Sequence, residues 1–196
     1  GPLAINSPGI LEASRTTAGF ANRWNYGGAV TGNGTLNATG AANTAGTSDG
    51  GWFDFTGSVA LTGQINVVSV VSGSDTTSSI WTGTTAAVDV ASNAVFTNRG
   101  NSIQIGALTG SGTVAAAWNG QTTQVLTIGA GGAGGTFSGT MRGNGGAVDG
   151  TLDAGVLNIA KIGAGTQILT GNNTYSGTTN VSGGTLQIGN AGTAGS

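Results

Sequence analysis

A short phrase, an apolar residue followed by Thr or Ser and then Gly, returns along the whole chain. It occurs as VTG (30–32), FTG (55–57), WTG (81–83), LTG (108–110), FSG (137–139) and LTG (169–171). The glycines are separated by 25, 26, 27, 29 and 32 residues. Repetition at a period of about 20 to 50 residues is typical of solenoids, propellers and other arrays. A fold of stacked units is therefore the first expectation.

Within each unit the apolar residues alternate as they do in β-strands. In TNVSGGTLQIGN (179–190), Val181, Leu186 and Ile188 are predicted to face one side and Thr179, Thr185 and Gln187 the other, and SIQIGAL (102–108) repeats this pattern. In TQVLTIG, Val125 and Ile128 are the predicted inward residues. Each run is short and ends at Gly or Asn, which tolerate the positive φ of tight corners. No segment shows a capped helical stripe, so the sequence predicts an all-β protein.

Short strands at regular spacing could form a sandwich or a barrel. A unit of about 20–30 residues, however, holds two or three strands and three corners, which is one turn of a parallel β-helix, or β-solenoid. Small inward side chains fit the narrow core of such a coil. Thr, Asn and Ser on the outer side keep the surface hydrated without charged residues. We therefore expect a parallel β-helix with about 20–30 residues per coil.

The composition argues against a disordered chain and against several classes of partner. Charged residues make up 6% of the chain, against roughly 25% in an average globular domain. A hydrophobic content of 37% argues against a disordered chain. The net charge is −2 and the five basic residues are scattered, so neither nucleic acid nor an anionic membrane surface is an expected partner. No apolar run is long enough to span a membrane as a helix, so direct membrane insertion is not expected.

The segment GAGTQILTGNNTYSGTTNVSGGTLQIGNAGTAGS (163–196) resembles the autotransporter-associated β-strand repeat. The residues that carry the resemblance are Leu169, Thr170, Gly171, Asn173, Thr174, Tyr175, Ser176, Gly177, Thr179, Val181, Gly183, Gly184, Thr185 and Leu186. The segments 105–114 and 137–146 resemble weaker copies. Gln167 and Ile168 depart from the Thr and Leu that are frequent in the family, a change we expect to leave function unaltered.

The resemblance implies a right-handed parallel β-helix from the passenger region of a type V secreted protein, or from a similar large bacterial surface protein. It therefore implies an extracellular location, displayed beyond the outer membrane. Residues 81–196 are predicted to be repeat-bearing coils. Residues 1–80 match only in style and are predicted to be N-terminal coils or a cap. The opening residues 1–3 resemble the remnant of a cleaved tag, which predicts a fragment of a longer chain.

Catalytic signals are weak. The sequence GTSDG around Ser48 matches a nucleophile elbow, but a serine nucleophile needs a His and the chain has none. The absence of both His and Cys also removes the usual zinc ligands. Asp49 and Asp54 flank two aromatic residues, and Asp149 and Asp153 lie four apart, so a glycosidase built on paired carboxylates is the remaining enzymatic alternative. We expect no enzyme, no catalytic residue, no metal and no cofactor.

Aromatic residues are few and four of them cluster. The candidate ligand-binding residues are Trp24 and Tyr26 in RWNYGG and Trp52 and Phe53 in GGWFDF. Exposed rings of this kind could stack on a glycan. The alternative is that they cover the open core at the N-terminal end of the solenoid. Trp81 and Trp118 are predicted to be single core or edge residues.

The expected function is a non-enzymatic stalk or adhesion scaffold of a bacterial cell-surface passenger. Its partners would be glycans, or molecules on a host or neighbouring cell, and self-association stays open. A glycan-binding module that uses the region of Trp24 and Trp52 is the alternative, followed by a carbohydrate-active β-helix enzyme.

Overall fold

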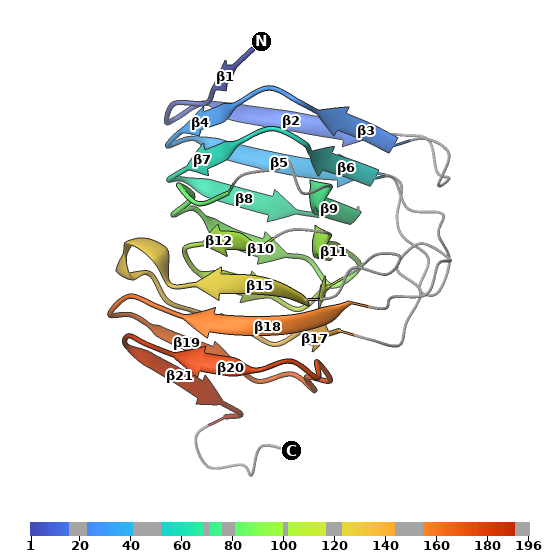
Figure 1. The fold of residues 1–196 in the computed structure, drawn as a ribbon. Coiled ribbons are helices and arrows are strands. Elements are labelled where there is room, and N and C mark those ends of the chain that lie inside the picture. Colours follow the sequence, from blue (N-terminus) through green and yellow to red (C-terminus); the bar gives the residue numbers. More distant parts are fainter. Residues whose placement is uncertain are drawn as a thin grey trace.

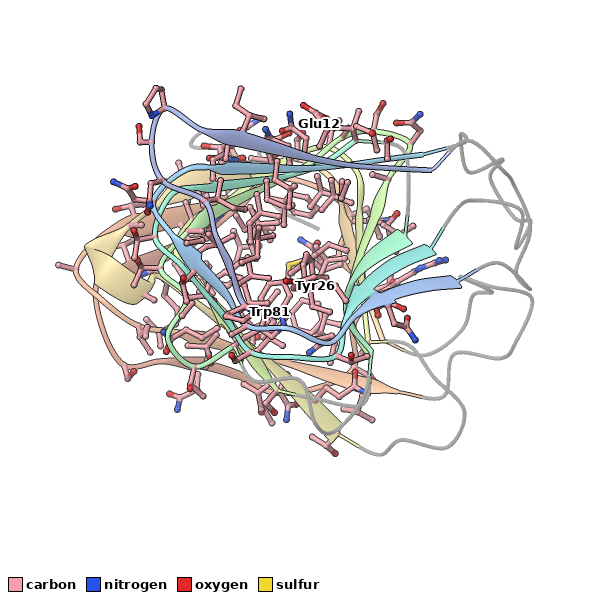
Figure 2. All side chains as sticks on the ribbon, turned by 90° about the horizontal axis from the view of Figure 1, so that it is seen from above. Glu12, Tyr26 and Trp81 are labelled. Atoms are coloured by element: carbon pink, nitrogen blue, oxygen red, sulfur yellow. The ribbon has the colours of Figure 1, made fainter. Side chains whose placement is uncertain are left out.

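The protein is a stack of β-coils that descends from the N-terminus to the C-terminus (Figure 1). The computed structural model describes residues 1–15, 23–40, 52–68, 71–75, 81–99, 102–116, 123–143 and 155–190. Strand β1 pairs with β4, and every other strand pairing between coils is likewise parallel. Viewed from the N-terminal end, the strand that carries Glu12 and the strand that carries Tyr26 follow one another clockwise while later coils recede (Figure 2). The coil is therefore right-handed, and the predicted parallel β-helix is confirmed.

Three faces surround the core, and one of them, the long face, is a continuous sheet of eight strands. Its strands are β2 (Ile10–Arg15), β5 (Thr35–Gly40), β8 (Gln64–Val67), β10 (Ala87–Val90), β13 (Leu108–Gly110), β16 (Gly135–Phe137), β19 (Thr166–Leu169) and β21 (Thr185–Ile188). Each strand pairs with the strand one coil later, so the long face joins the first coil to the last.

The second face, called here the aromatic face, is a six-stranded sheet. Its strands are β3 (Arg23–Tyr26), β6 (Trp52–Phe55), β9 (Val71–Asp75), β11 (Val95–Arg99), β14 (Thr113–Ala115) and β17 (Thr140–Arg142). The third face, the broken face, consists of two separate sheets. Its strands are β1 (Leu3–Ala4), β4 (Val30–Gly32) and β7 (Val59–Leu61), then β12 (Ile103–Ile105), β15 (Thr123–Ile128), β18 (Val156–Lys161) and β20 (Thr179–Val181).

The break in the third face lies at Trp81, where no strand is formed. The buried indole packs edge-on against Phe55 at a centroid distance of 5.7 Å and against Phe96 at 5.8 Å. Main-chain hydrogen bonds remain only near the corner, such as the one from the Thr85 amide to the Leu61 carbonyl at 2.9 Å. Side chains add two more: Thr84 Oγ1 donates to the Val59 carbonyl at 2.6 Å, and Gln104 Nε2 donates to the Thr84 carbonyl at 3.1 Å. Trp81 is thus a core residue, as predicted, whereas Trp118 lies outside the described residues.

Coil length varies while the strand register is kept. Partners in the long face are 29 residues apart from Leu36 to Ile65, 20 from Val88 to Leu108 and 19 from Leu169 to Ile188. The longest step is the one of 32 residues from Gly135 to Gln167. A short 3₁₀ turn, η1 (Ala130–Gly132), precedes this step and lies between β15 and β16. Among the described residues, no helix is long and apolar enough to cross a membrane.

Inward side chains form columns because equivalent positions of successive coils lie in register. Leu36, Ile65, Val88 and Leu108 stack in this way and are buried. Strand β15 corrects one prediction: Leu126 and Ile128 face inward, whereas Val125 lies on the outer side. The reason is the two-residue period of a strand, which cannot place positions 125 and 128 on the same side.

The glycines of the recurring phrase lie at corners of the coils, but not at the same corner of every coil. Gly32 lies beside Ile5 of the previous coil and pairs with Leu61 of the next. Gly139 and Gly171, by contrast, lie directly beside one another, since a Cβ on Gly171 would be 1.8 Å from the Gly139 carbonyl oxygen. Glycine is needed there because neighbouring coils approach too closely for any side chain. The phrase therefore detects strand ends rather than the coil period itself.

Candidate functional site

The four predicted ligand-binding residues come together on two adjacent strands of the aromatic face. Strands β3 and β6 pair in parallel, with Trp24 opposite Phe53 and Tyr26 opposite Phe55. The side chains of Trp24, Trp52 and Phe53 lie outside what the structure describes. Their backbone positions form a compact group at the N-terminal end of the stack (Figure 1). The ligand-binding role of this group stays a prediction.

Tyr26 is the one candidate whose side chain is described. It is half-buried, packs against the hydrophobic core and donates a hydrogen bond from its hydroxyl to the Gly1 carbonyl at 2.7 Å. Figure 2 shows it within the ring of coils rather than on the outer surface. This arrangement fits the alternative in which the aromatic residues cover the open end of the core.

The predicted acidic residues are not assembled into a described site. Asp54 lies on β6 and is fully buried, beside Asn25 of β3 in the strand register. Asp49, Asp149 and Asp153 lie outside the described residues, as does Ser48. Within the described ranges, no group of three or more His, Cys, Asp and Glu side chains is arranged to hold a metal ion.

A polar column on the outer side of the long face was not predicted. Glu12, Asn37 and Asn66 lie in register on successive strands. The Asn37 amide donates to the Glu12 carboxylate, and the Asn66 amide donates to Asn37 Oδ1 at 2.8 Å. Asp89 continues the column and accepts a hydrogen bond from Thr109 Oγ1 at 2.7 Å. The sequence signal was a polar residue between two apolar ones in each strand, and its alignment depends on the coil lengths.

Gln167 is a buried polar residue whose role the sequence did not reveal. Its Nε2 donates to the Leu108 carbonyl at 2.9 Å, and its Oε1 accepts from the Leu108 amide at 3.1 Å. Gly135 is the strand partner of Gln167 and lies between the two residues in the sheet order β13-β16-β19. A Cβ on Gly135 would be 2.9 Å from the Leu108 carbonyl oxygen. Glycine at this position therefore leaves space for the Gln167 side chain to reach Leu108. Gln167 thus replaces a missing strand contact between coils.

Lys161 is the second buried polar residue of the C-terminal coils. Its Nζ donates to the carbonyl oxygens of Ile162 at 2.6 Å, Gly163 at 3.1 Å and Gly183 at 3.2 Å. The first two acceptors belong to its own coil and the third to the next coil. Because a buried ammonium group needs all of its donors satisfied, this geometry ties the two coils together at a corner.

Both residues lie in the part of the chain that matches a known repeat. Residues 159–188 match the family model described as the passenger-associated-transport-repeat. The match covers the second half of β18 together with β19, β20 and β21. No curated protein and no solved structure matches the chain. The repeat family implies a protein that is secreted or displayed at a surface. The division of the chain into residues 1–80 and 81–196, made from the sequence, stays a prediction. The match to a passenger-associated-transport-repeat at residues 159–188 thus agrees with the resemblance to an autotransporter repeat, and the matched segment lies within a parallel β-solenoid.

Proposed function

We propose that this chain is a rigid, non-enzymatic scaffold in a passenger region displayed on the outer surface of a bacterium. The observation that carries the proposal is the continuity of the stack. One hydrophobic core extends from Ile5 to Leu169, and the long face pairs main chains through all eight of its strands. A solenoid held by main-chain hydrogen bonds between neighbouring coils resists bending and stretching.

Rigidity can be measured along the long face. Ile10 and Thr185 occupy the same outer column at its two ends, and both are exposed. Seven strand steps at a spacing of about 4.8 Å place them about 34 Å apart. The chain has no cysteine, so an Ile10→Cys, Thr185→Cys double variant can carry spin labels at these positions alone. A single narrow distance distribution supports the scaffold, whereas a broad distribution contradicts it.

Adhesion is the finer part of the proposal. The hydroxyl and amide groups on the outer faces would meet host glycans or sister cells through many weak contacts, which add up in a repetitive surface. Such contacts would be lost gradually when several outer Thr and Asn residues are replaced together. Binding that one substitution abolishes would point instead to a discrete site.

The strand register of the four aromatic residues supports a glycan-binding module as the second candidate. A glycan array tests it. Saturable binding that is lost in Trp24→Ala or Trp52→Ala, but kept in Val68→Ala, would favour this module. Val68 is a suitable control because it is an exposed apolar residue directly after β8. A blank array would favour the scaffold alone. Glycan turnover that disappears in Asp49→Asn or Asp54→Asn would overturn the non-enzymatic assignment.

A further inference from the structure

The corner after β4 places the pair Asn33–Gly34 against the preceding coil. Asn33 is exposed, and its side-chain Oδ1 accepts a hydrogen bond from the Ser7 main-chain amide at 2.9 Å. Gly34 is buried and donates its main-chain amide to the Ile5 carbonyl at 2.8 Å. The side chain of Asn33 and the main-chain nitrogen that follows it are therefore both held by the same neighbouring coil.

This pair has the chemistry of a spontaneous modification site. Once the Gly34 amide nitrogen has lost its proton to water, it can attack the side-chain carbonyl carbon of Asn33. A succinimide ring forms, the bond from that carbon to Nδ2 breaks, and ammonia leaves after it takes up a proton from water. A second water molecule then opens the ring at either carbonyl and gives Asp or isoaspartate. Glycine favours the attack because it has no Cβ to obstruct it and its backbone turns freely.

The fold opposes this reaction through the main chain on both sides of Gly34. Its N–H is bound to Ile5, and its carbonyl accepts the Gln64 amide of the next coil at 3.2 Å. Attack requires the peptide between Asn33 and Gly34 to turn toward the Asn33 side chain. The packing leaves no room for this turn, since a Cβ on Gly34 would be 2.5 Å from the Gly9 carbonyl oxygen and 2.7 Å from the Ile5 side chain. The reaction therefore needs the two coils to separate at this corner.

The isoaspartate product would prevent the corner from closing in its original register. In isoaspartate the main chain runs through the former side chain, which adds one main-chain atom between residue 33 and Gly34. The groups on either side are also bound to the next coil, because the Thr62 amide donates to the Gly32 carbonyl at 2.9 Å and the Gln64 amide to Gly34. A lengthened corner would not fit both hydrogen bonds at once.

We propose that Asn33 is a modification site that converts to Asp and isoaspartate only when the coil segment 5–9 separates from it. The conversion is irreversible, so the modified fraction records how often this corner has opened. The site is additional to the scaffold function and does not depend on it.

Peptide mass spectrometry of protein kept in mildly alkaline buffer measures the conversion. Cleavage after Arg23 and Arg99 gives a peptide with a single Asn–Gly pair. We expect conversion in the native protein to be about tenfold or more slower than in the same chain unfolded in urea, because opening limits it. Equal rates would overturn the proposal, and so would an unchanged mass gain in Asn33→Gln, whose longer side chain forms the ring poorly.

Two matched variants test which opening controls the reaction. Ile5→Ala removes a buried side chain from the coil that holds Asn33, and Ile159→Ala removes the same side chain from the core of a distant coil. Both leave a cavity of the same kind. We expect Ile5→Ala to speed the conversion by about tenfold or more and Ile159→Ala to keep the parental rate. Equal acceleration in both, which would indicate global unfolding, or no acceleration in Ile5→Ala, would contradict control by the corner.

Hydrogen exchange at the Gly34 amide tests the same opening without any variant, so the proposal stays testable if Ile5→Ala fails to fold. Separation of the coils exposes this N–H for exchange as well as for attack. The slowing of exchange relative to the unfolded chain should therefore equal the slowing of Asn33 conversion. Rapid exchange at Gly34 together with slow conversion would show that the coil contact does not protect Asn33.

Discussion

Replacing Gln167 with Leu should destabilise the solenoid far more than its position in a strand suggests. The change keeps an inward side chain of similar size but removes both hydrogen bonds to the Leu108 main chain. A buried donor or acceptor left without a partner costs about 1–3 kcal/mol, so the two groups of Leu108 together cost about 2–6 kcal/mol. The added apolar burial of Leu returns about 1–2 kcal/mol. The midpoints of these ranges leave a net loss of about 2.5 kcal/mol in the free energy of unfolding.

Urea unfolding followed by far-UV circular dichroism measures this loss. Gln187→Leu is the matched control, because it makes the same change in the same sheet at a half-buried outer position. That control should stay within about 0.5 kcal/mol of the parent. Equal stability of Gln167→Leu and the parent, or an equal loss in the control, would refute the bridging role of Gln167.

Gln167→Glu gives an independent check through pH. A protonated carboxyl group has one O–H donor and one carbonyl acceptor, so it can reproduce both hydrogen bonds to Leu108. A carboxylate has no donor for the Leu108 carbonyl. The folded state therefore favours the protonated form, and the stability of this variant should be greatest at low pH and fall as the pH rises. A variant whose stability relative to the parent does not depend on pH would contradict this account.

Three further predictions concern the coil contacts. Gly171→Ala should cost about 1–3 kcal/mol or more through its clash with the Gly139 carbonyl, whereas Gly27→Ala, whose nearest neighbour would be 3.4 Å away, should unfold at the parental urea concentration. Lys161, the only lysine, is fully buried, so an amine-directed reagent should label only the N-terminus of the native protein by mass spectrometry; rapid labelling of Lys161 would show that the corner opens. Trp81→Ala should cost about 3–5 kcal/mol and reduce the near-UV circular dichroism signal, and an unchanged unfolding midpoint would contradict its place in the core.

The sequence was sufficient for the fold class because one rule repeats in every coil. Alternation placed Ile103 and Ile105 in the core, and both are buried. Leu186 and Ile188 likewise occupy inward columns. The same rule failed for Val125, where two apolar residues three positions apart were assigned to one side of a strand.

The contacts of the polar core residues could not be predicted from the sequence. Gln167 and Lys161 occupy inward positions, but the Leu108 and Gly183 groups that they bind lie on other coils and can be assigned as neighbours only when the length of each coil is known. Corner lengths vary without a sequence rule, since glycine permits many turns. The aromatic candidates could be grouped from sequence, yet burial of Tyr26 against the core depends on its position at the end of the stack.

The gap at Trp81 makes the three sides of the rod mechanically unequal. Two sides keep their main-chain ladders past this level, whereas the broken face has no strand there and is held by a few main-chain hydrogen bonds near the corner, by the indole and by the side chains of Thr84 and Gln104. Side-chain contacts yield under smaller loads than a row of paired strands. The solenoid should therefore bend most easily in the direction that opens the broken face. Its two ends would then move relative to one another mainly within one plane rather than equally in all directions.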